Sequence, residues 1–258
     1  MDKLTLIKVG GKIVENEETL TKLLNDFRQI AGYKVLVHGG GKMATEISER
    51  LGIETKMVDG RRITDAETLK VVTMVYAGLV NKNIVARLQA LGINALGLCG
   101  ADLNLVTAEK RPVKEVDYGF VGDVKNVRCE QLADLITSDV VPVIAPISHD
   151  RQGQLLNTNA DTMANEVAKA LATCFDVNLY YCFEKAGVLA DPDNEASVIP
   201  QITYSDYLEY KEQGVIQGGM IPKLDNAFNA LACGVHEVVI TRADQLLINT
   251  GTHIVSER

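Results

Sequence analysis

Two lysines stand where a cation needs a partner, and one aspartate stands at the start of a predicted helix. Lys8 lies near the end of the apolar run LTLIKV, where a buried ammonium group is unfavourable unless it is paired. Lys223 falls in the first turn of a predicted helix, where the helix dipole disfavours a cation unless an anion is bound nearby. Asp161 opens another predicted helix. Such groups suit phosphoryl transfer, in which positioned charges stabilise the migrating group and little covalent chemistry is needed.

Short glycine turns precede three of the predicted helices. Bare glycine amides and a helix N-terminus together attract anions, so each turn is a candidate phosphate cradle. A tight turn without a ligand is the alternative for any one of them, and the recurrence favours the cradle. The residues concerned are Gly10 and Gly11, Gly39 to Gly41, and Gly218 and Gly219.

The glycine turns do not match the common nucleotide-binding fingerprints. The P-loop pattern fails because Leu36 occupies its first glycine position and Met43 follows Lys42. The dinucleotide pattern fails because Ala44 occupies its last glycine position. A nicotinamide-dependent dehydrogenase is therefore not supported.

Two further segments contain side chains suited to an amino-acid ligand. Arg61 and Arg62 follow a glycine in VDGRRITD, and a guanidinium group can bind a carboxylate through two hydrogen bonds. A solvated surface pair is the alternative. In LLNTNAD, Asn157, Asn159 and Asp161 alternate before a helix, which is more polar groups than one helix cap requires.

The predicted elements alternate between strands and helices. The strand-like runs are mostly continuous and β-branched, which is typical of strands covered on both faces; they are LTLIKV, KVLVHG, NALGLC, VVPVIAPI, VNLYYCF, HEVVIT and THIV. Helices are predicted over 16–30, 66–91, 161–172 and 221–232, and after the second glycine turn. Residues 107–128 alternate around a turn and predict a β-hairpin insertion. We expect an α/β fold, a three-layer sandwich around a mostly parallel open sheet, with ligands beyond the carboxyl ends of its strands.

Composition limits the possible partners. The chain has 258 residues, 47% of them hydrophobic, and a net charge of −8, which argues against nucleic acid or an anionic membrane as the main partner. No signal peptide or membrane-spanning run is visible. The five cysteines are scattered, which is typical of a reducing compartment, and the four histidines do not cluster, so no metal site is predicted. We expect a cytoplasmic protein.

With these segments the chain resembles the amino-acid kinase family, and within it the members that act on an N-acylated glutamate. The resemblance runs essentially from end to end through LIKVGGK, VHGGGK, GRRITD, LLNTNAD, GMIPKL and GTHI. It implies ATP-dependent phosphorylation of the γ-carboxylate of N-acetyl-L-glutamate, with ATP and Mg²⁺, in arginine biosynthesis. The magnesium ion is expected on phosphate oxygens and water, and no protein cage is expected to hold it.

The resemblance also implies roles for individual residues. Lys8 and Lys223 would stabilise the migrating phosphoryl group, and Asp161 would hold both lysines. Arg62, Asn157 and Asn159 would bind the acylglutamate beside the second glycine turn. The residues implied in phosphate and nucleotide binding are Gly10, Gly11, Gly40, Gly41, Glu184, Gly187, Gly218 and Gly219.

The same resemblance implies an N-terminal lobe over 1–173, for acylglutamate binding and dimerisation, and a nucleotide-binding lobe over 174–258. Lys8 comes close to the start of the sequence, and relatives inhibited by arginine have an extra helix before it, so a homodimer without arginine feedback is expected. The small-molecule partners would be the N-acylglutamate and ATP.

Two positions depart from the family pattern. Arg61 replaces an apolar residue and raises the possibility that the acyl group carries a carboxylate, as in N-succinylglutamate. Glu184 and Lys185 replace an aspartate and an apolar residue on the nucleotide side. The alternatives are N-succinylglutamate as acceptor, another member of the family, or a non-catalytic nucleotide-binding sensor, although a sensor need not keep Lys8, Asp161 and Lys223 together.

Overall fold

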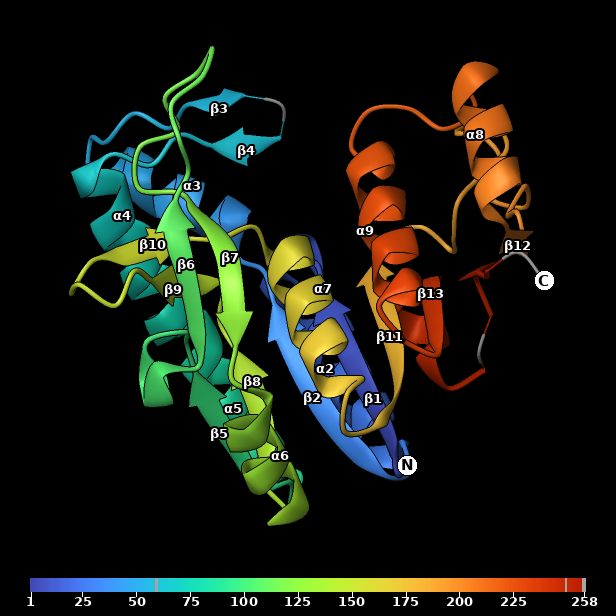
Figure 1. Cartoon of the computed structure of the whole chain (residues 1–258), viewed down its shortest axis with the longest axis horizontal. Coiled ribbons are helices and arrows are strands. Elements are labelled where there is room, and N and C mark those ends of the chain that lie inside the picture. Colours follow the sequence, from blue (N-terminus) through green and yellow to red (C-terminus); the bar gives the residue numbers. More distant parts are fainter. Residues whose placement is uncertain (59, 249, 257–258) are drawn as a thin grey trace.

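One eight-stranded sheet runs through the computed structural model, which describes residues 1–58, 60–248 and 250–256 (Figure 1). Neighbouring strands are parallel except for the pair β13–β14, so the predicted mostly parallel open sheet is confirmed. In spatial order the strands are β12 (Gln201–Ile202), β14 (Thr252–Ile254), β13 (Glu237–Arg242), β11 (Asp176–Phe183), β1 (Lys3–Val9), β2 (Tyr33–His38), β8 (Val141–Ile144) and β5 (Ala95–Leu98).

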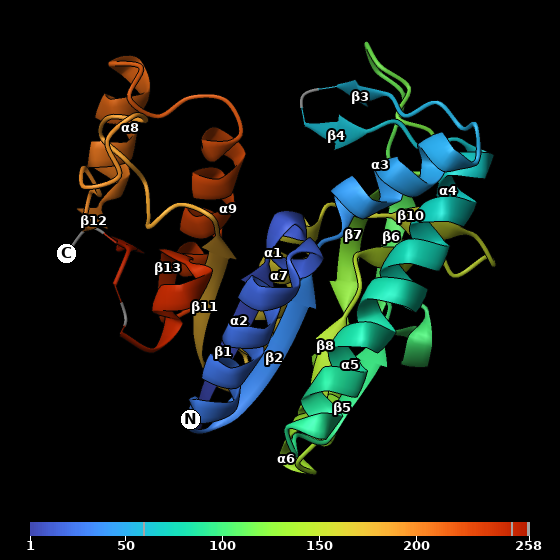
Figure 2. The ribbon, with the colours of Figure 1, turned by 180° about the vertical axis from the view of Figure 1, so that it is seen from behind.

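Helices cover both faces of this sheet and complete the expected three layers. The face nearer the viewer in Figure 1 is covered by α6 (Cys129–Thr137), α7 (Ala160–Leu171) and α9 (Met220–Ala232). The opposite face, seen in Figure 2, is covered mainly by α2 (Glu17–Gln29) and α5 (Asn81–Ala90). Each face has its own hydrophobic core: Leu6 packs in one and its neighbour Ile7 in the other, because successive side chains of a strand point to opposite sides.

The predicted β-hairpin insertion is present. Strands β6 (Val106–Lys110) and β7 (Gly122–Val127) pair antiparallel and join β9 (Ile147–His149) and β10 (Leu155–Asn157) in a second, four-stranded sheet. The connection between β6 and β7 contacts the chain near Thr64, where the Thr64 amide donates to the Tyr118 carbonyl at 2.9 Å. This contact fixes the hairpin beside the small ribbon of β3 (Met57–Val58) and β4 (Arg61–Arg62).

The helix predicted over 66–91 is present from Ala66 to Ala90, but its middle is π-helical, which the sequence did not indicate. The segment consists of α4 (Ala66–Thr73), a π-helical stretch (Met74–Val80) and α5. Side-chain periodicity indicates only that a segment is helical, and the wider π turn is decided by what the helix packs against. The described residues also form α1 (Gly11–Glu15), α3 (Gly41–Arg50), α8 (Tyr204–Glu212) and two 3₁₀ helices (Asp102–Asn104 and Ala243–Ile248). Of these helices and α6, only α3 was predicted.

The large sheet continues across residue 173. Strand β11 pairs with β1 from Lys3 and Asp176 to Val9 and Cys182, so the segments 1–173 and 174–258 share one sheet. The later segment forms one end of the molecule, drawn in orange and red in Figure 1. No helix of the described residues is long and apolar enough to cross a membrane.

Candidate active site

The two N-terminal glycine turns meet at one edge of the sheet. Strands β1 and β2 are adjacent and parallel, with Val9 opposite His38, so both chains leave the sheet at the same edge. The Gly39 amide donates to the Val9 carbonyl at 2.9 Å. A Cβ atom on Gly11 would lie 3.3 Å from the Gly40 nitrogen, so the approach of the two turns leaves little room for a side chain. Helices α1 and α3 begin at Gly11 and Gly41, and both N-termini therefore lie beside this approach.

The four glycines that the sequence singled out here are not equivalent. The Gly10 amide donates to the Cys182 carbonyl at 3.0 Å and extends the contact of β1 with β11. Gly11, Gly40 and Gly41 line a cavity. An anion in this cavity would therefore meet the turns at these three residues, while Gly10 shapes the turn.

Asp161 joins the two lysines. The Lys8 ammonium lies 2.7 Å from its Oδ1 atom and the Lys223 ammonium lies 3.0 Å from its Oδ2 atom. Burial alone would raise the pKa of Asp161, but the two ammonium groups outweigh burial and lower that pKa to about 2. The carboxylate is therefore ionised at neutral pH and carries one negative charge against two positive charges, which leaves the cluster with a net positive charge.

Three elements bring this cluster together. Lys8 comes from β1, Asp161 from the first turn of α7 and Lys223 from the first turn of α9. The Asn159 side-chain oxygen caps α7 and accepts hydrogen bonds from the amides of Asp161 (2.9 Å) and Thr162 (3.0 Å). This cap fixes the backbone that carries Asp161, and it accounts for one of the three polar groups that alternate in this segment.

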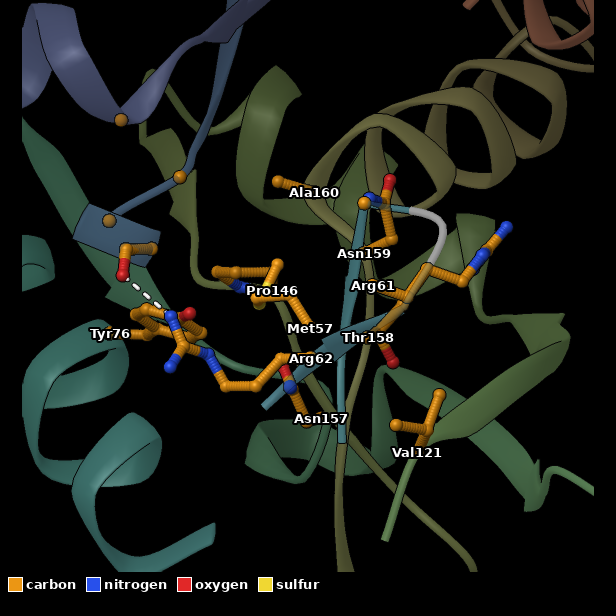
Figure 3. Close-up of a pocket in the computed structure, with 15 residues that line it drawn as sticks. Met57, Arg61, Arg62, Tyr76, Val121, Pro146, Asn157, Thr158, Asn159 and Ala160 are labelled. Atoms are coloured by element: carbon orange, nitrogen blue, oxygen red, sulfur yellow. Dashed lines mark hydrogen bonds between the residues drawn. The ribbon is translucent and has the colours of Figure 1, made fainter. Parts of the chain in front are cut away.

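A cavity of about 180 Å³ lies beside the glycine turns (Figure 3). Arg62, only 7% exposed, is held there by hydrogen bonds to the Gly41 carbonyl (2.7 Å) and to the hydroxyls of Thr45 (2.9 Å) and Thr55 (3.2 Å). Asn157 is also buried and donates to the Thr64 hydroxyl at 3.0 Å. The cavity is lined by Gly11, Gly39, Gly40, Gly41, Met57, Gly60, Arg61, Arg62, Tyr76, Val121, Pro146, Asn157, Thr158, Asn159 and Ala160.

Arg61 points away from its neighbour. Figure 3 shows the side chains of Arg61 and Arg62 leaving β4 in opposite directions, as expected for successive residues of a strand. Arg62 extends toward Tyr76, whereas Arg61 is half-buried near Arg111 and Asp123. Desolvation, followed by the Arg111 charge, lowers the pKa of Arg61.

A second cavity, of about 250 Å³, lies in the C-terminal part of the chain. Gly187, for which the sequence predicts a nucleotide-binding role, is one of its lining residues. Gly218 and Gly219 directly precede the lining residue Met220, and Gly219 is the N-cap of α9. Glu184 pairs with Lys12 at 3.1 Å and is not among the lining residues. The residues lining this cavity are Lys185, Gly187, Val188, Leu189, Pro192, Gly214, Val215, Gln217 and Met220.

Sequence reasoning missed several residues that line the first cavity, and one, Thr45, that holds Arg62. Tyr76 comes from the π-helical stretch, and its ring would meet a Cβ atom on Gly40 at 3.2 Å. Thr45 orients Arg62, and Pro146 and Thr158 complete the wall. The signal for Thr45 was available, because it stands one helical turn after Gly41 and faces the same side of α3. Tyr76 had no local signal, since a tyrosine in an apolar helix is normally a core residue.

The fold is that of the amino acid kinase family. The model of that family matches residues 3–242, and the chain belongs to the family. The expected family and fold class are confirmed.

More particularly, the chain is 65% identical to the acetylglutamate kinase of Parabacteroides distasonis, with 98% of this chain and 100% of the relative covered. It is 67% identical to the acetylglutamate kinase of Bacteroides thetaiotaomicron, with 98% of each chain covered. Among solved structures it is similar to smu.665 from Streptococcus mutans, with a TM-score of 0.81, 29% identity and 98% of each chain covered.

Proposed function

We propose that the protein transfers the γ-phosphoryl group of ATP to the γ-carboxylate of N-acetyl-L-glutamate, forming N-acetyl-L-glutamyl 5-phosphate and ADP, as a step of arginine biosynthesis. The observation that carries the proposal is the position of Asp161 between Lys8 and Lys223, one residue beyond the wall of the Arg62 cavity. The names of the curated relatives support the same reaction.

The chemistry follows from the charges. A γ-carboxylate oxygen of the acceptor attacks the γ-phosphorus, the bond from that phosphorus to the bridging oxygen of ATP breaks, and ADP leaves with the bond's electron pair. Both reactants are anions, so their approach needs positive charge fixed in advance. Lys8 and Lys223 supply that charge, and Asp161 holds both ammonium groups so that little reorganisation is required.

The first cavity suits the acylated amino acid. Arg62 is buried, cationic and already fixed by three hydrogen bonds, so it can bind an α-carboxylate with little further loss of side-chain freedom. Asn157 and Asn159 line this cavity and offer amide groups for the acylamide. Gly40 and Gly41 line it too and would lie beside the reacting carboxylate and phosphate.

The second cavity suits the nucleotide. We place ATP along 185–220, with Gly187, Gly218 and Gly219 near it and Glu184 at its edge through the pair with Lys12. The two cavities support the division into an acylglutamate lobe (1–173) and a nucleotide lobe (174–258), because the first is lined by residues 11–160 and the second by residues 185–220.

Magnesium would accompany the nucleotide. Within residues 1–58, 60–248 and 250–256, no group of three or more His, Cys, Asp or Glu side chains could hold a metal ion. Phosphate oxygens and water would be the ligands of Mg²⁺, because this ion usually keeps several of its waters and binds substrate phosphates. Its charge would add to that of the two lysines.

The two candidate acceptors, N-acetylglutamate and N-succinylglutamate, differ only in their acyl group. Arg61 lines the cavity, which favours an acyl group with its own carboxylate, as in N-succinylglutamate. Its side chain, however, leaves β4 away from Arg62 and lies near Arg111 and Asp123. We therefore propose the acetyl compound as the main substrate and retain the succinyl compound as the second candidate.

We further propose a cytoplasmic homodimer. Met74 (57% exposed) and Leu79 (48% exposed) lie on the π-helical stretch, where an apolar face supports contact with a second copy. The five cysteines are free, which suits a reducing compartment. Size-exclusion chromatography with light scattering tests the dimer, and a monomer in solution would contradict it.

The test of the reaction is transfer from Mg²⁺-ATP with the acyl phosphate trapped by hydroxylamine. The acceptors are N-acetylglutamate, N-succinylglutamate, glutamate and aspartate. Lys8→Ala removes one catalytic ammonium, and Lys125→Ala, at an exposed lysine of β7, is the matched control. Turnover of N-acetylglutamate that Lys8→Ala abolishes and Lys125→Ala keeps supports the proposal. Turnover of none of these acceptors, despite ATP binding, would refute it and favour a nucleotide-binding sensor.

A further inference from the structure

His38 lies directly beneath the second glycine turn. It is the last residue of β2, is fully buried, and immediately precedes Gly39. Its Nδ1 atom is 2.8 Å from the Gly39 carbonyl oxygen and its Nε2 atom is 3.1 Å from the Asn81 amide nitrogen. The reaction proposed above gives it no chemical role.

The hydrogen bonds around Asn81 fix the tautomer of His38. The Asn81 Nδ2 group donates to the Val143 carbonyl at 2.9 Å, and its Oδ1 atom accepts from the Lys82 ammonium at 3.1 Å. The amide orientation is thereby set, and its remaining N–H faces His38 Nε2, which must accept. The imidazole proton therefore resides on Nδ1, from which it donates to the Gly39 carbonyl. Burial lowers the pKa of His38 to about 4, and the Lys82 charge acts in the same direction, so the ring is neutral at physiological pH.

This hydrogen bond sets the direction of a peptide plane. The structure has no cis peptide bonds among its described residues, and in a trans peptide the C=O and the following N–H point in opposite directions. The Gly39 carbonyl points inward to buried His38, so the Gly40 N–H points outward, and Gly40 lines the cavity. Both residues of this peptide are glycines, so no side chain opposes its rotation. The histidine supplies the restraint that the glycines lack.

The π-helical stretch supports the same peptide from the other side. Tyr76 and Val80 lie against Gly40, at 3.2 and 3.3 Å from the position of a Cβ atom. Asn81 follows Val80 directly, at the point where the π-helix changes to an α-helix. The side chains of Tyr76 and Val80 and the side-chain amide of Asn81 therefore all lie around the second glycine turn. A π-helical turn at such a position is frequent at functional sites.

We propose that His38 is a positioning residue for phosphoryl transfer: its Nδ1–H holds the Gly39–Gly40 peptide so that the Gly40 N–H faces the reacting anion, and Asn81 holds His38 in the required tautomer. This inference rests on the proposed function for the identity of the anion. The hydrogen-bonding arrangement itself does not depend on that reaction.

Two variants of His38 separate the role of each ring nitrogen. His38→Asn places an amide group near the former Nδ1 position and can still donate to the Gly39 carbonyl. His38→Gln reaches the former Nε2 position and loses that donor. We expect His38→Asn to keep kcat within about 3-fold of the original chain and His38→Gln to lower kcat about 10-fold or more, with a smaller change in KM. Equal losses in both variants at equal stability, or no loss in either, would overturn the proposal.

A second measurement tests the tautomer without catalysis. The chain has four histidines, so nitrogen-15 spectra of the imidazole side chains are simple, and His38→Asn identifies the signal of interest. A neutral Nδ1–H ring at pH 7 is expected, and an Nε2–H ring or an imidazolium would overturn the inference. If no acylglutamate is phosphorylated while the Nδ1–H tautomer is present, the proposed function fails, and the inference that His38 holds the Gly39–Gly40 peptide stands. This measurement also decides the case if His38→Gln does not fold.

Discussion

Replacing Asp161 by asparagine removes the negative charge that holds two ammonium groups. The side chains of Lys8, Asp161 and Lys223 are 10%, 17% and 19% exposed, so the unpaired cations of the variant stay largely away from water. Removing one partner of a buried ion pair is destabilising by roughly 3–5 kcal/mol, and the residual exposure places this site near the lower end. We expect Asp161→Asn to lower the free energy of unfolding at pH 6 by about 3 kcal/mol.

The pKa of Asp161 makes this difference depend on pH. The folded-state pKa is about 2 against an ordinary value of 3.8, so the carboxylate contributes stability that is complete above pH 3.8 and is lost as the pH falls toward 2. The portion lost at pH 3 is about 1 kcal/mol, from the ratio of the two proton-binding polynomials. The gap in unfolding free energy between the original chain and Asp161→Asn should therefore narrow from about 3 to about 2 kcal/mol between pH 6 and pH 3.

Urea titrations followed by far-ultraviolet circular dichroism measure this gap, since the chain has no tryptophan for a fluorescence probe. Asp134→Asn, at an exposed position of α6, is the control and should change the unfolding free energy by less than about 0.5 kcal/mol at either pH. In the transfer assay Asp161→Asn should lower kcat about 100-fold, because the two ammonium groups are no longer fixed. A gap that stays constant or widens at pH 3, or an unchanged kcat, would refute this account of the cluster.

Three further perturbations test other parts of the site. Arg62→Lys loses the planar guanidinium group that Thr45 and the Gly41 carbonyl hold, and it should raise KM for the acylglutamate about 10-fold or more. Arg61→Lys should change KM less, and equal effects of the two variants would contradict the assignment of Arg62 to the acylglutamate. Gly40→Ala should destabilise the fold by about 1–3 kcal/mol in urea, because φ is +150° there and Tyr76 blocks the new methyl group, and retention of full stability would count against the geometry. His38 should contribute about 2 kcal/mol less to the free energy of unfolding at pH 5 than at pH 7. Its folded-state pKa of about 4 lies below its ordinary value of 6.5, so the unfolded chain takes up the proton first as the pH falls. His38→Asn should lack this loss, and parallel pH profiles of unfolding free energy for the two proteins would disprove it.

The sequence was sufficient for the layers of the fold and for the charged residues of the site. Continuous apolar strands alternating with amphipathic helices indicated a parallel sheet covered on both faces, and this pattern is local. Lys8 within a strand and Lys223 in a first helical turn were recognisable because both positions are unfavourable for an unpaired cation. Residue chemistry alone does not distinguish Arg61 from Arg62, because only the folded strand shows that Arg62 extends toward Tyr76 and that Arg61 leaves in the opposite direction.

Other features depend on contacts between distant segments. No periodicity in the sequence indicates the π-helical stretch 74–80. Nor does it connect the segments that meet where the Gly10 amide donates to the Cys182 carbonyl and where Tyr76 packs against Gly40. Composition and spacing showed that Lys8, Asp161, Lys223, Arg62 and the glycines were available for chemistry. Only the tertiary structure decided which ammonium meets which carboxylate oxygen and which peptide plane His38 orients, because those relations arise where strands from different parts of the sequence end at one edge of the same sheet.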